Sequence, residues 1–236
     1  MAVAPTGPSA GAAPAAQASV PVPVVLVPGW MGFPESMNVL AGSFEIDGRA
    51  TYLLDQNKPF IFDFLGFPTT DTSTNGPRLA ALVDHALAET GADQVDLVGY
   101  SYGGLVARHY VKDLGGEANV RRYVGIGVPQ RGVAAACGLD YEEAGHLCPG
   151  TPLMSAVNAG DDTPGAIEYS NIWSDEDGAG NVAVDGPVCV RHVPGVPHLL
   201  EPFSPAVVAE ALARVRGEPC PAADRFDGQG PDAQGP

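Results

Sequence analysis

The chain has 236 residues, 45% of them hydrophobic, and its 28 acidic against 12 basic residues give a formal net charge of −16. This length and apolar content suit one domain with a full core better than two domains. The acidic balance would repel phosphate backbones and anionic membrane surfaces, which argues against nucleic acid as a partner. No apolar run approaches the length of about 18 residues that a membrane span needs, so stable membrane insertion is not expected.

The two ends of the chain differ in composition from its middle. Residues 1–22 are rich in Ala, Pro and Gly and lack the basic and leucine-rich segments of a signal peptide, so we expect a flexible leader. Residues 217–236 are rich in Gly, Pro, Asp and Gln, and we expect a flexible tail there. The folded domain is therefore predicted over residues 23–216.

The first predicted elements are two strands and a helix. An apolar, β-branched run over residues 22–30 ends in Pro-Gly and predicts a strand buried on both faces. The apolar, aromatic run over residues 58–68 predicts a second strand, and a polar turn follows it. Residues 78–90 place their leucine and valine side chains on one helical face, and Gly91 ends that predicted helix.

The second half continues the alternation of strands and helices. Residues 94–101 predict a strand, and residues 102–116 predict a helix that begins directly after it. The remaining predicted elements are strands over 123–128, 167–173 and 187–193 and a closing helix over 204–216. Buried strands that alternate with helices predict an α/β protein whose mostly parallel sheet is covered on both faces.

The pattern G-x-S-x-G, which marks the nucleophile of many hydrolases, occurs twice, at Gly7–Gly11 and at Gly99–Gly103. So short a pattern also arises by chance in a glycine-rich chain. Only the second match lies where a predicted strand turns into a predicted helix, and its two glycines give the room that such a turn requires. Ser101 is therefore the predicted nucleophile, with a helix N-cap serine as the alternative.

A serine nucleophile needs a histidine to take its proton and a carboxylate to orient that histidine. In the chain order Ser, acid, His, both partners lie in loops that follow later strands. Asp175, Glu176 and Asp177 follow one predicted strand and are the candidate acids. His198 lies in the loop after the last strand and is the predicted base, whereas His192 falls within that strand.

An oxyanion hole requires two backbone N–H groups, one after the nucleophile and one in the loop after the first strand. Tyr102 and Trp30 are the predicted donors, with Met31 as an alternative to Trp30. Together with Trp30, Met31 and Phe33 are predicted to form an apolar rim for an acyl chain. The loop-rich segment 130–164 either contributes to this rim or packs onto the core. No metal or other cofactor is predicted.

The chain has four cysteines and no C-x-x-C pair, which favours disulfides and export to an oxidising compartment over a zinc site. Proximity in the sequence suggests a Cys137–Cys148 bond within one loop and a Cys189–Cys220 bond between the last strand and the C-terminal region. Four cysteines allow three pairings, so this pairing is a hypothesis.

The segments around Ser101, Asp177 and His198 resemble those of the small bacterial class 2 lipases, which are compact members of the α/β-hydrolase superfamily. The resemblance covers most of residues 24–216 and is most specific around the nucleophile and in the helix before it. It implies an α/β-hydrolase fold and a secreted triacylglycerol lipase or esterase that cleaves lipid or small esters, and we expect a monomer. It also implies Asp177 as the catalytic acid and His198 as the base. Many members have His-Gly where this chain has Pro28-Gly29.

Two other functions remain open from the sequence. An acyltransferase or thioesterase would use the same three residues with a different acceptor or leaving group. A non-catalytic binding module would keep the fold without the chemistry.

Overall fold

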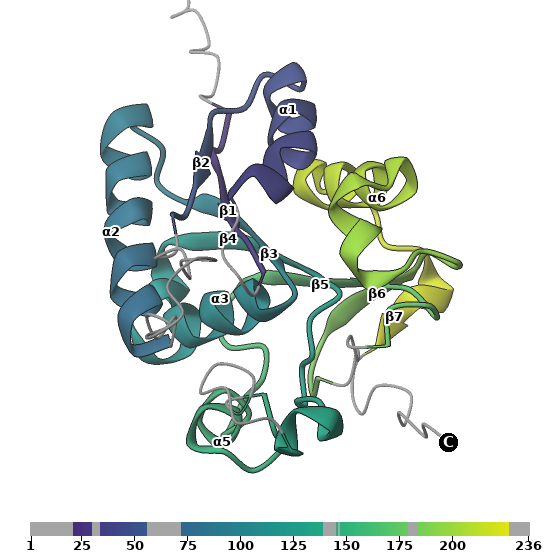
Figure 1. Ribbon diagram of the computed structural model, residues 1–236. Helices are drawn as coiled ribbons and strands as arrows, with labels where there is room; N and C mark the ends of the chain where they lie inside the picture. Colours follow the sequence, from purple (N-terminus) through teal and green to yellow (C-terminus); the bar gives the residue numbers. More distant parts are fainter. Residues whose placement is uncertain are drawn as a thin grey trace, which may run out of the picture.

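The structure is a computed structural model, and it describes residues 21–29, 34–55, 72–138, 145, 147–178 and 184–226. Its strands are β1 (Val24–Val27), β2 (Thr51–Leu53), β3 (Val95–Tyr100), β4 (Val120–Ile126), β5 (Glu168–Trp173), β6 (Val188–His192) and β7 (Arg225–Phe226). They form one sheet in the order β2-β1-β3-β4-β5-β6-β7 (Figure 1). All neighbours are parallel except β6 and β7. This sheet confirms the predicted α/β class.

Helices cover both faces of the sheet. The α-helices are α1 (Asn38–Ile46), α2 (Thr72–Thr90), α3 (Tyr102–Asp113), α5 (Pro152–Val157) and α6 (Pro205–Arg216). The 3-10 helices are η1 (Pro34–Met37), η2 (Gly116–Ala118), η3 (Ala134–Gly138), η4 (His198–Phe203) and η5 (Ala222–Asp224). In Figure 1, α2, α3 and α5 lie on one side of the strands, and α1 and α6 lie on the other.

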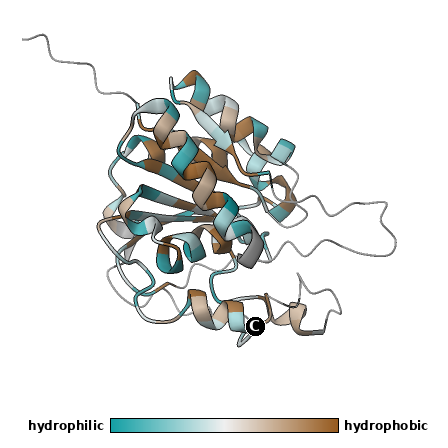
Figure 2. Ribbon diagram, turned by 90° about the vertical axis from the view of Figure 1, so that its left-hand side faces the viewer, coloured by the Kyte–Doolittle hydropathy of each residue, from teal (hydrophilic) through white to brown (hydrophobic). Residues whose placement is uncertain are grey.

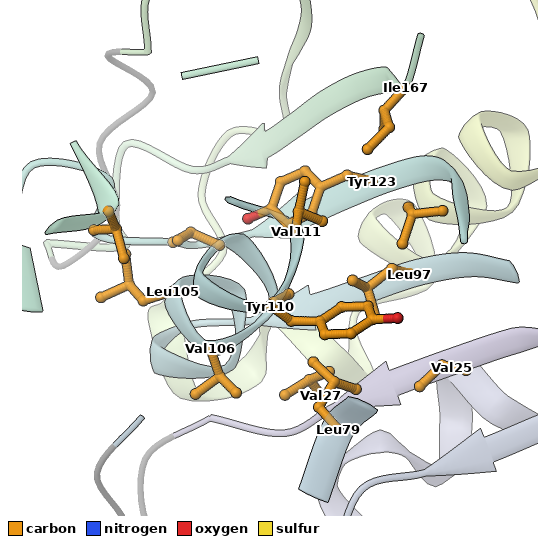
Figure 3. Packing of buried hydrophobic residues seen from close by; sticks show 14 of the residues in the cluster. Val25, Val27, Leu79, Leu97, Leu105, Val106, Tyr110, Val111, Tyr123 and Ile167 are labelled. Carbon is orange, nitrogen blue, oxygen red and sulfur yellow. The ribbon is translucent and has the colours of Figure 1, made fainter. Parts of the chain in front are cut away.

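The core consists of two hydrophobic layers, because alternate residues of a strand point to opposite faces of the sheet. Val25 and Leu97 pack under α2 and α3, with Tyr110 of α3 among their neighbours (Figure 3). Val24 and Val98 face the other way, into the layer that α1 and α6 close. Both faces of the central strands are therefore buried, which explains their nearly continuous apolar sequences and their brown colour in Figure 2.

The predicted strands over 22–30, 94–101, 123–128, 167–173 and 187–193 correspond to β1, β3, β4, β5 and β6. The strand predicted over 58–68 lies outside the described residues. Helix α1 and strand β2 were not predicted: α1 has only nine residues and β2 only three, so neither leaves a long periodic pattern in the sequence.

Helix α2 begins at Thr72, six residues before its predicted start, although the Asn-Gly-Pro sequence there favours a turn. The cause is tertiary packing against α3. Gly76 lies so close to Leu114 and His109 that an added Cβ atom would come within 2.6 Å of the first and 3.0 Å of the second. Contacts with α3 therefore override the local preference of this segment.

The first part of the segment predicted as a flexible tail, residues 217–226, contacts strand β6. Cys220 is bonded to Cys189 of β6, and β7 pairs antiparallel with the same strand. The structure also contains the predicted bond between Cys137 and Cys148. The C-terminal region up to residue 226 is thus fixed to the last parallel strand of the sheet.

Candidate active site

Ser101 lies on a strained turn between β3 and α3. Among the described residues it is the only non-glycine residue with a positive φ, at 52°. A Cβ atom at Gly99 would lie 2.6 Å from the Cα of Gly104, and one at Gly103 would overlap the backbone carbonyl of Val27. Only glycine at these two positions lets strand and helix approach so closely. The turn holds Ser101 at the N-terminus of α3, where the helix dipole is positive.

The hydroxyl group of Ser101 contacts the imidazole of His198. The distance from Ser101 Oγ to His198 Nε2 is 2.9 Å. His198 is the first residue of η4, and its backbone carbonyl accepts a 2.8 Å hydrogen bond from the hydroxyl of Tyr100. Tyr100 directly precedes the nucleophile, so this bond fixes the histidine loop to the end of β3.

The three candidate acids have different surroundings. Asp177 has a fully buried side chain, and its Oδ1 contacts Nδ1 of His198. Asp175 is 54% exposed and lies 3.4 Å from His192, which stacks on the ring of Trp173. Glu176 is also exposed. Of the three acids, the structure therefore brings Asp177 to His198.

Two hydrogen bonds hold the acid loop beside the histidine loop. Ser174 Oγ accepts a 2.9 Å bond from the backbone N–H of Val196, and Asp175 Oδ1 accepts a 2.8 Å bond from that of Gly195. The first loop follows β5 and the second follows β6, which are parallel neighbours whose carboxyl ends meet at one edge of the sheet. Asp175 thus has a structural contact in the loop that carries the histidine.

Glu201 is a site residue that the sequence analysis missed. Its side chain is fully buried, and its Oε2 lies 3.2 Å from Nδ1 of His198. Gly127, at the end of β4, gives it space, because a Cβ atom there would overlap this carboxylate oxygen. The sequence signal was the spacing of three residues between His198 and Glu201, which places both side chains on one side of a helical turn.

The two carboxylates determine the charge of His198. Burial lowers the pKa of this imidazole, but its contacts with Asp177 and Glu201 outweigh burial and raise the pKa to about 9. Burial raises the pKa of the Glu201 carboxyl group, and the nearby charge of Asp177 acts in the same direction. The side chains of Asp177, His198 and Glu201 are also of the types that bind metal ions, with one ligand atom from each lying within 4.8 Å of the others.

The predicted oxyanion donors lie partly within the described residues. Tyr102 is buried and is the first residue of α3. Gly29 lies against the nucleophile, since a Cβ atom there would be 3.1 Å from the Cβ of Ser101. The loop after β1 therefore leaves the sheet beside Ser101. The other predicted residues of this loop lie outside the described residues: Trp30, Met31 and Phe33.

The described part of segment 130–164 packs onto α3. Arg108 of α3 is 2% exposed and donates hydrogen bonds to Asp162 Oδ1 at 2.8 Å, to the carbonyl of Val157 at 2.8 Å and to Gln130 Oε1 at 3.0 Å. A buried guanidinium ion needs such partners, and the segment supplies them. This arrangement favours the second interpretation of the segment, packing onto the core.

Apolar side chains are exposed next to the histidine. Leu199, Leu200 and Phe203 of η4 are 77%, 55% and 46% exposed. Three large apolar side chains on one short segment form a surface that an apolar group can approach. Among the described helices, none combines the length and apolar character that crossing a membrane requires.

Comparisons with known proteins match residues 22–150 to the family described as the alpha/beta hydrolase fold. Proteins named triacylglycerol lipase from Pseudarthrobacter phenanthrenivorans and Burkholderia plantarii are each 34% identical to this chain over 111 residues, or 47% of its length. The matched region spans only 34% and 30% of these curated relatives. The solved structure of Aspergillus fumigatus lipase B has the same fold, with a TM-score of 0.65 and 15% identity over 90% of this chain and 54% of that chain.

Proposed function

The chain belongs to the α/β-hydrolase fold family, and on this premise we propose that it is a carboxylic ester hydrolase with Ser101, His198 and Asp177 as its catalytic triad. The observation that carries the proposal is the contact chain from Ser101 Oγ to His198 Nε2, at 2.9 Å, and from His198 Nδ1 to the buried Asp177. The strained turn at the N-terminus of α3 supports the same assignment, since a nucleophile in hydrolases of this fold occupies such a turn.

In the proposed reaction, His198 Nε2 removes the proton of Ser101 while Oγ attacks the ester carbonyl carbon. The backbone N–H groups of Tyr102 and Trp30 receive the developing oxyanion. His198 then gives the proton to the leaving alcohol, which departs and leaves an acyl group on Ser101. A water molecule, deprotonated by His198, hydrolyses this acyl-enzyme and releases the carboxylic acid. Asp177 orients the imidazole and stabilises its charged form.

We expect the substrate to be an uncharged lipid ester. The relatives named triacylglycerol lipase support this class, and so do the exposed Leu199, Leu200 and Phe203 beside the proposed base. The net charge of −16 disfavours approach to anionic surfaces. The disulfides Cys137–Cys148 and Cys189–Cys220 support export from the cytoplasm, where thiols are kept reduced.

Labelling with a fluorophosphonate probe tests the nucleophile. The native protein should be labelled, and the Ser101→Ala variant should not. Failure of the native protein to react would favour a non-catalytic binding module. Hydrolysis rates on p-nitrophenyl esters of increasing chain length then test the substrate class, because a rate confined to short acyl chains would exclude the lipase assignment and leave an esterase. Faster acyl transfer to an added alcohol than to water would favour the acyltransferase alternative.

A further inference from the structure

Three side chains with metal-binding atoms converge on one point of the site. Nδ1 of His198 contacts Oδ1 of Asp177 and lies 3.2 Å from Oε2 of Glu201. Both carboxylate side chains are fully buried. The ligand atoms of all three lie within 4.8 Å of one another, the separation expected around a single ion.

The contacts of Glu201 are incomplete. Within the described residues, neither of its carboxylate oxygens accepts a hydrogen bond of normal geometry. The one N–H on Nδ1 of His198 faces two carboxylates, so it cannot satisfy both. A buried carboxylate without a full set of partners is costly, because it has lost its hydration. Two buried carboxyl groups beside one imidazole nitrogen therefore leave a place for a cation.

We propose that Asp177, His198 and Glu201 form an inhibitory zinc site, in which Zn²⁺ replaces the proton on Nδ1 of His198. Two carboxylates balance the charge of one divalent cation, and the imidazole stays neutral. Zinc bonds of about 2.0–2.2 Å in tetrahedral geometry separate two ligand atoms by about 3.3–3.6 Å. The 3.2 Å between His198 Nδ1 and Glu201 Oε2 nearly matches this separation, whereas Asp177 Oδ1 lies closer to Nδ1 and would have to move away from it. Water would fill the fourth position.

The donor set favours zinc over the harder cations. An imidazole nitrogen with two carboxylates suits zinc, whereas calcium takes six to eight oxygen ligands and magnesium requires near-octahedral geometry with several waters. Three protein ligands at one buried point are too few for calcium, and they include a nitrogen that magnesium rarely selects.

Inhibition follows from the position of the imidazole proton and therefore rests on the proposed function, whereas metal binding does not. A neutral imidazole has one N–H group. When Nδ1 binds zinc, this proton is on Nε2, the nitrogen that lies 2.9 Å from Ser101 Oγ. Nε2 is then a hydrogen-bond donor and cannot accept the serine proton. If His198 was charged, the second proton leaves to solvent; if it was neutral, the proton moves from Nδ1 to Nε2.

Zinc titration of ester hydrolysis tests the inhibition. Zinc chloride in a non-chelating buffer should reduce the rate reversibly, and EDTA should restore it. For the Glu201→Gln variant, each rate is compared with the zinc-free rate of the same variant. The zinc concentration that halves this rate should be at least about ten-fold higher than for the native protein, because a ligand is lost. The matched control is His85→Gln, which removes an exposed histidine that lies 3.2 Å from Glu89 and so tests zinc binding at the surface. An unchanged half-inhibition in Glu201→Gln, or relief of inhibition in the control, would overturn the proposal.

Calorimetric zinc titration of the Ser101→Ala variant separates metal binding from catalysis, because this variant keeps all three ligands without the nucleophile. We expect one site that is weakened at least about ten-fold by adding either Glu201→Gln or Asp177→Asn. Two different ligand variants keep the test decisive if one of them folds poorly. Zinc binding without any ester hydrolysis in the native protein would overturn the proposed function alone. Hydrolysis without this site would overturn the zinc proposal alone.

Discussion

Replacing Glu201 with glutamine should move the pH dependence of ester hydrolysis to lower pH. Glutamine keeps the shape of the side chain and removes its charge, which lies 3.2 Å from Nδ1 of His198. The base must be neutral to accept the proton of Ser101, so kcat/KM rises as His198 loses its proton. Because the pKa of His198 is raised to about 9, the native enzyme should reach full activity only above that pH.

The size of the shift can be bounded from the structure. Two unit charges 3.2 Å apart interact by about 5 kcal/mol at an effective dielectric constant of about 20, or nearly four pKa units. This is an upper limit, because burial raises the pKa of Glu201 and so disfavours the charged form of its carboxyl group. The pKa of His198 rises from 6.5 to about 9 in total, and the closer Asp177 accounts for much of this rise. We therefore expect Glu201→Gln to lower the pKa of His198 by about one.

The assay is kcat/KM for a soluble p-nitrophenyl ester between pH 6 and pH 10. At pH 7 the neutral fraction of the base would increase from about 1% to about 9%, so the variant should be several-fold faster than the native enzyme there. At high pH it should be slower, since a weaker base removes the proton less readily. Glu176→Gln is the matched control, because this exposed carboxylate lies outside the cluster and its loss should leave the profile unchanged. A profile of Glu201→Gln that stays in place or moves to higher pH would refute the reasoning.

Three further predictions test the site and its support. Asp177→Asn should reduce kcat by at least about 10²-fold, whereas Asp175→Asn should keep most activity; the reverse result would reassign the acid. Gly103→Ala should lower the free energy of unfolding, measured by urea denaturation, by about 3 kcal/mol, because the added methyl group would overlap backbone atoms. Gly42→Ala is the control: a Cβ atom there has no neighbour within 4 Å, so this variant should raise the free energy of unfolding by about 0.5–1 kcal/mol. Asp162→Asn leaves the buried guanidinium of Arg108 without its carboxylate partner and should lower the free energy of unfolding by about 3–5 kcal/mol in the same experiment. A decrease below about 1 kcal/mol would contradict this prediction.

The parts of the site that could be predicted from the sequence are those encoded locally. Ser101 lies between a buried strand and a helix, with Gly99 and Gly103 two positions away on either side, and all of these features are visible within about a dozen residues. His198 could be placed because it follows the last parallel strand, and the carboxyl ends of parallel strands share one edge. The same reasoning located a group of three acids but did not distinguish Asp177 from Asp175 without the family resemblance.

The remaining features depend on burial, which cannot be recognised from the identity of a single residue in the sequence. Asp175 and Asp177 differ in the structure because one is half-exposed and the other enclosed beside the imidazole. Glu201 was missed because glutamate is rarely buried, so a glutamate in the sequence is expected at the surface. The early start of α2 at Thr72 was missed for a related reason, since contacts of Gly76 with α3 form only after both helices have folded.

The hydrogen bond between Ser101 and His198 joins residues 97 positions apart and requires β5 and β6 to be in place. Contacts between residues so far apart in the sequence form late, because the chain between them must lose conformational entropy before the contact can stabilise the fold. A chain that has paired only β1, β3 and β4 would contain most of the hydrophobic layer under α3 and yet lack both the acid and the base. During refolding, secondary structure should therefore recover before catalytic activity. Under the proposed function, an ester assay would report that β5 and β6 have completed the sheet.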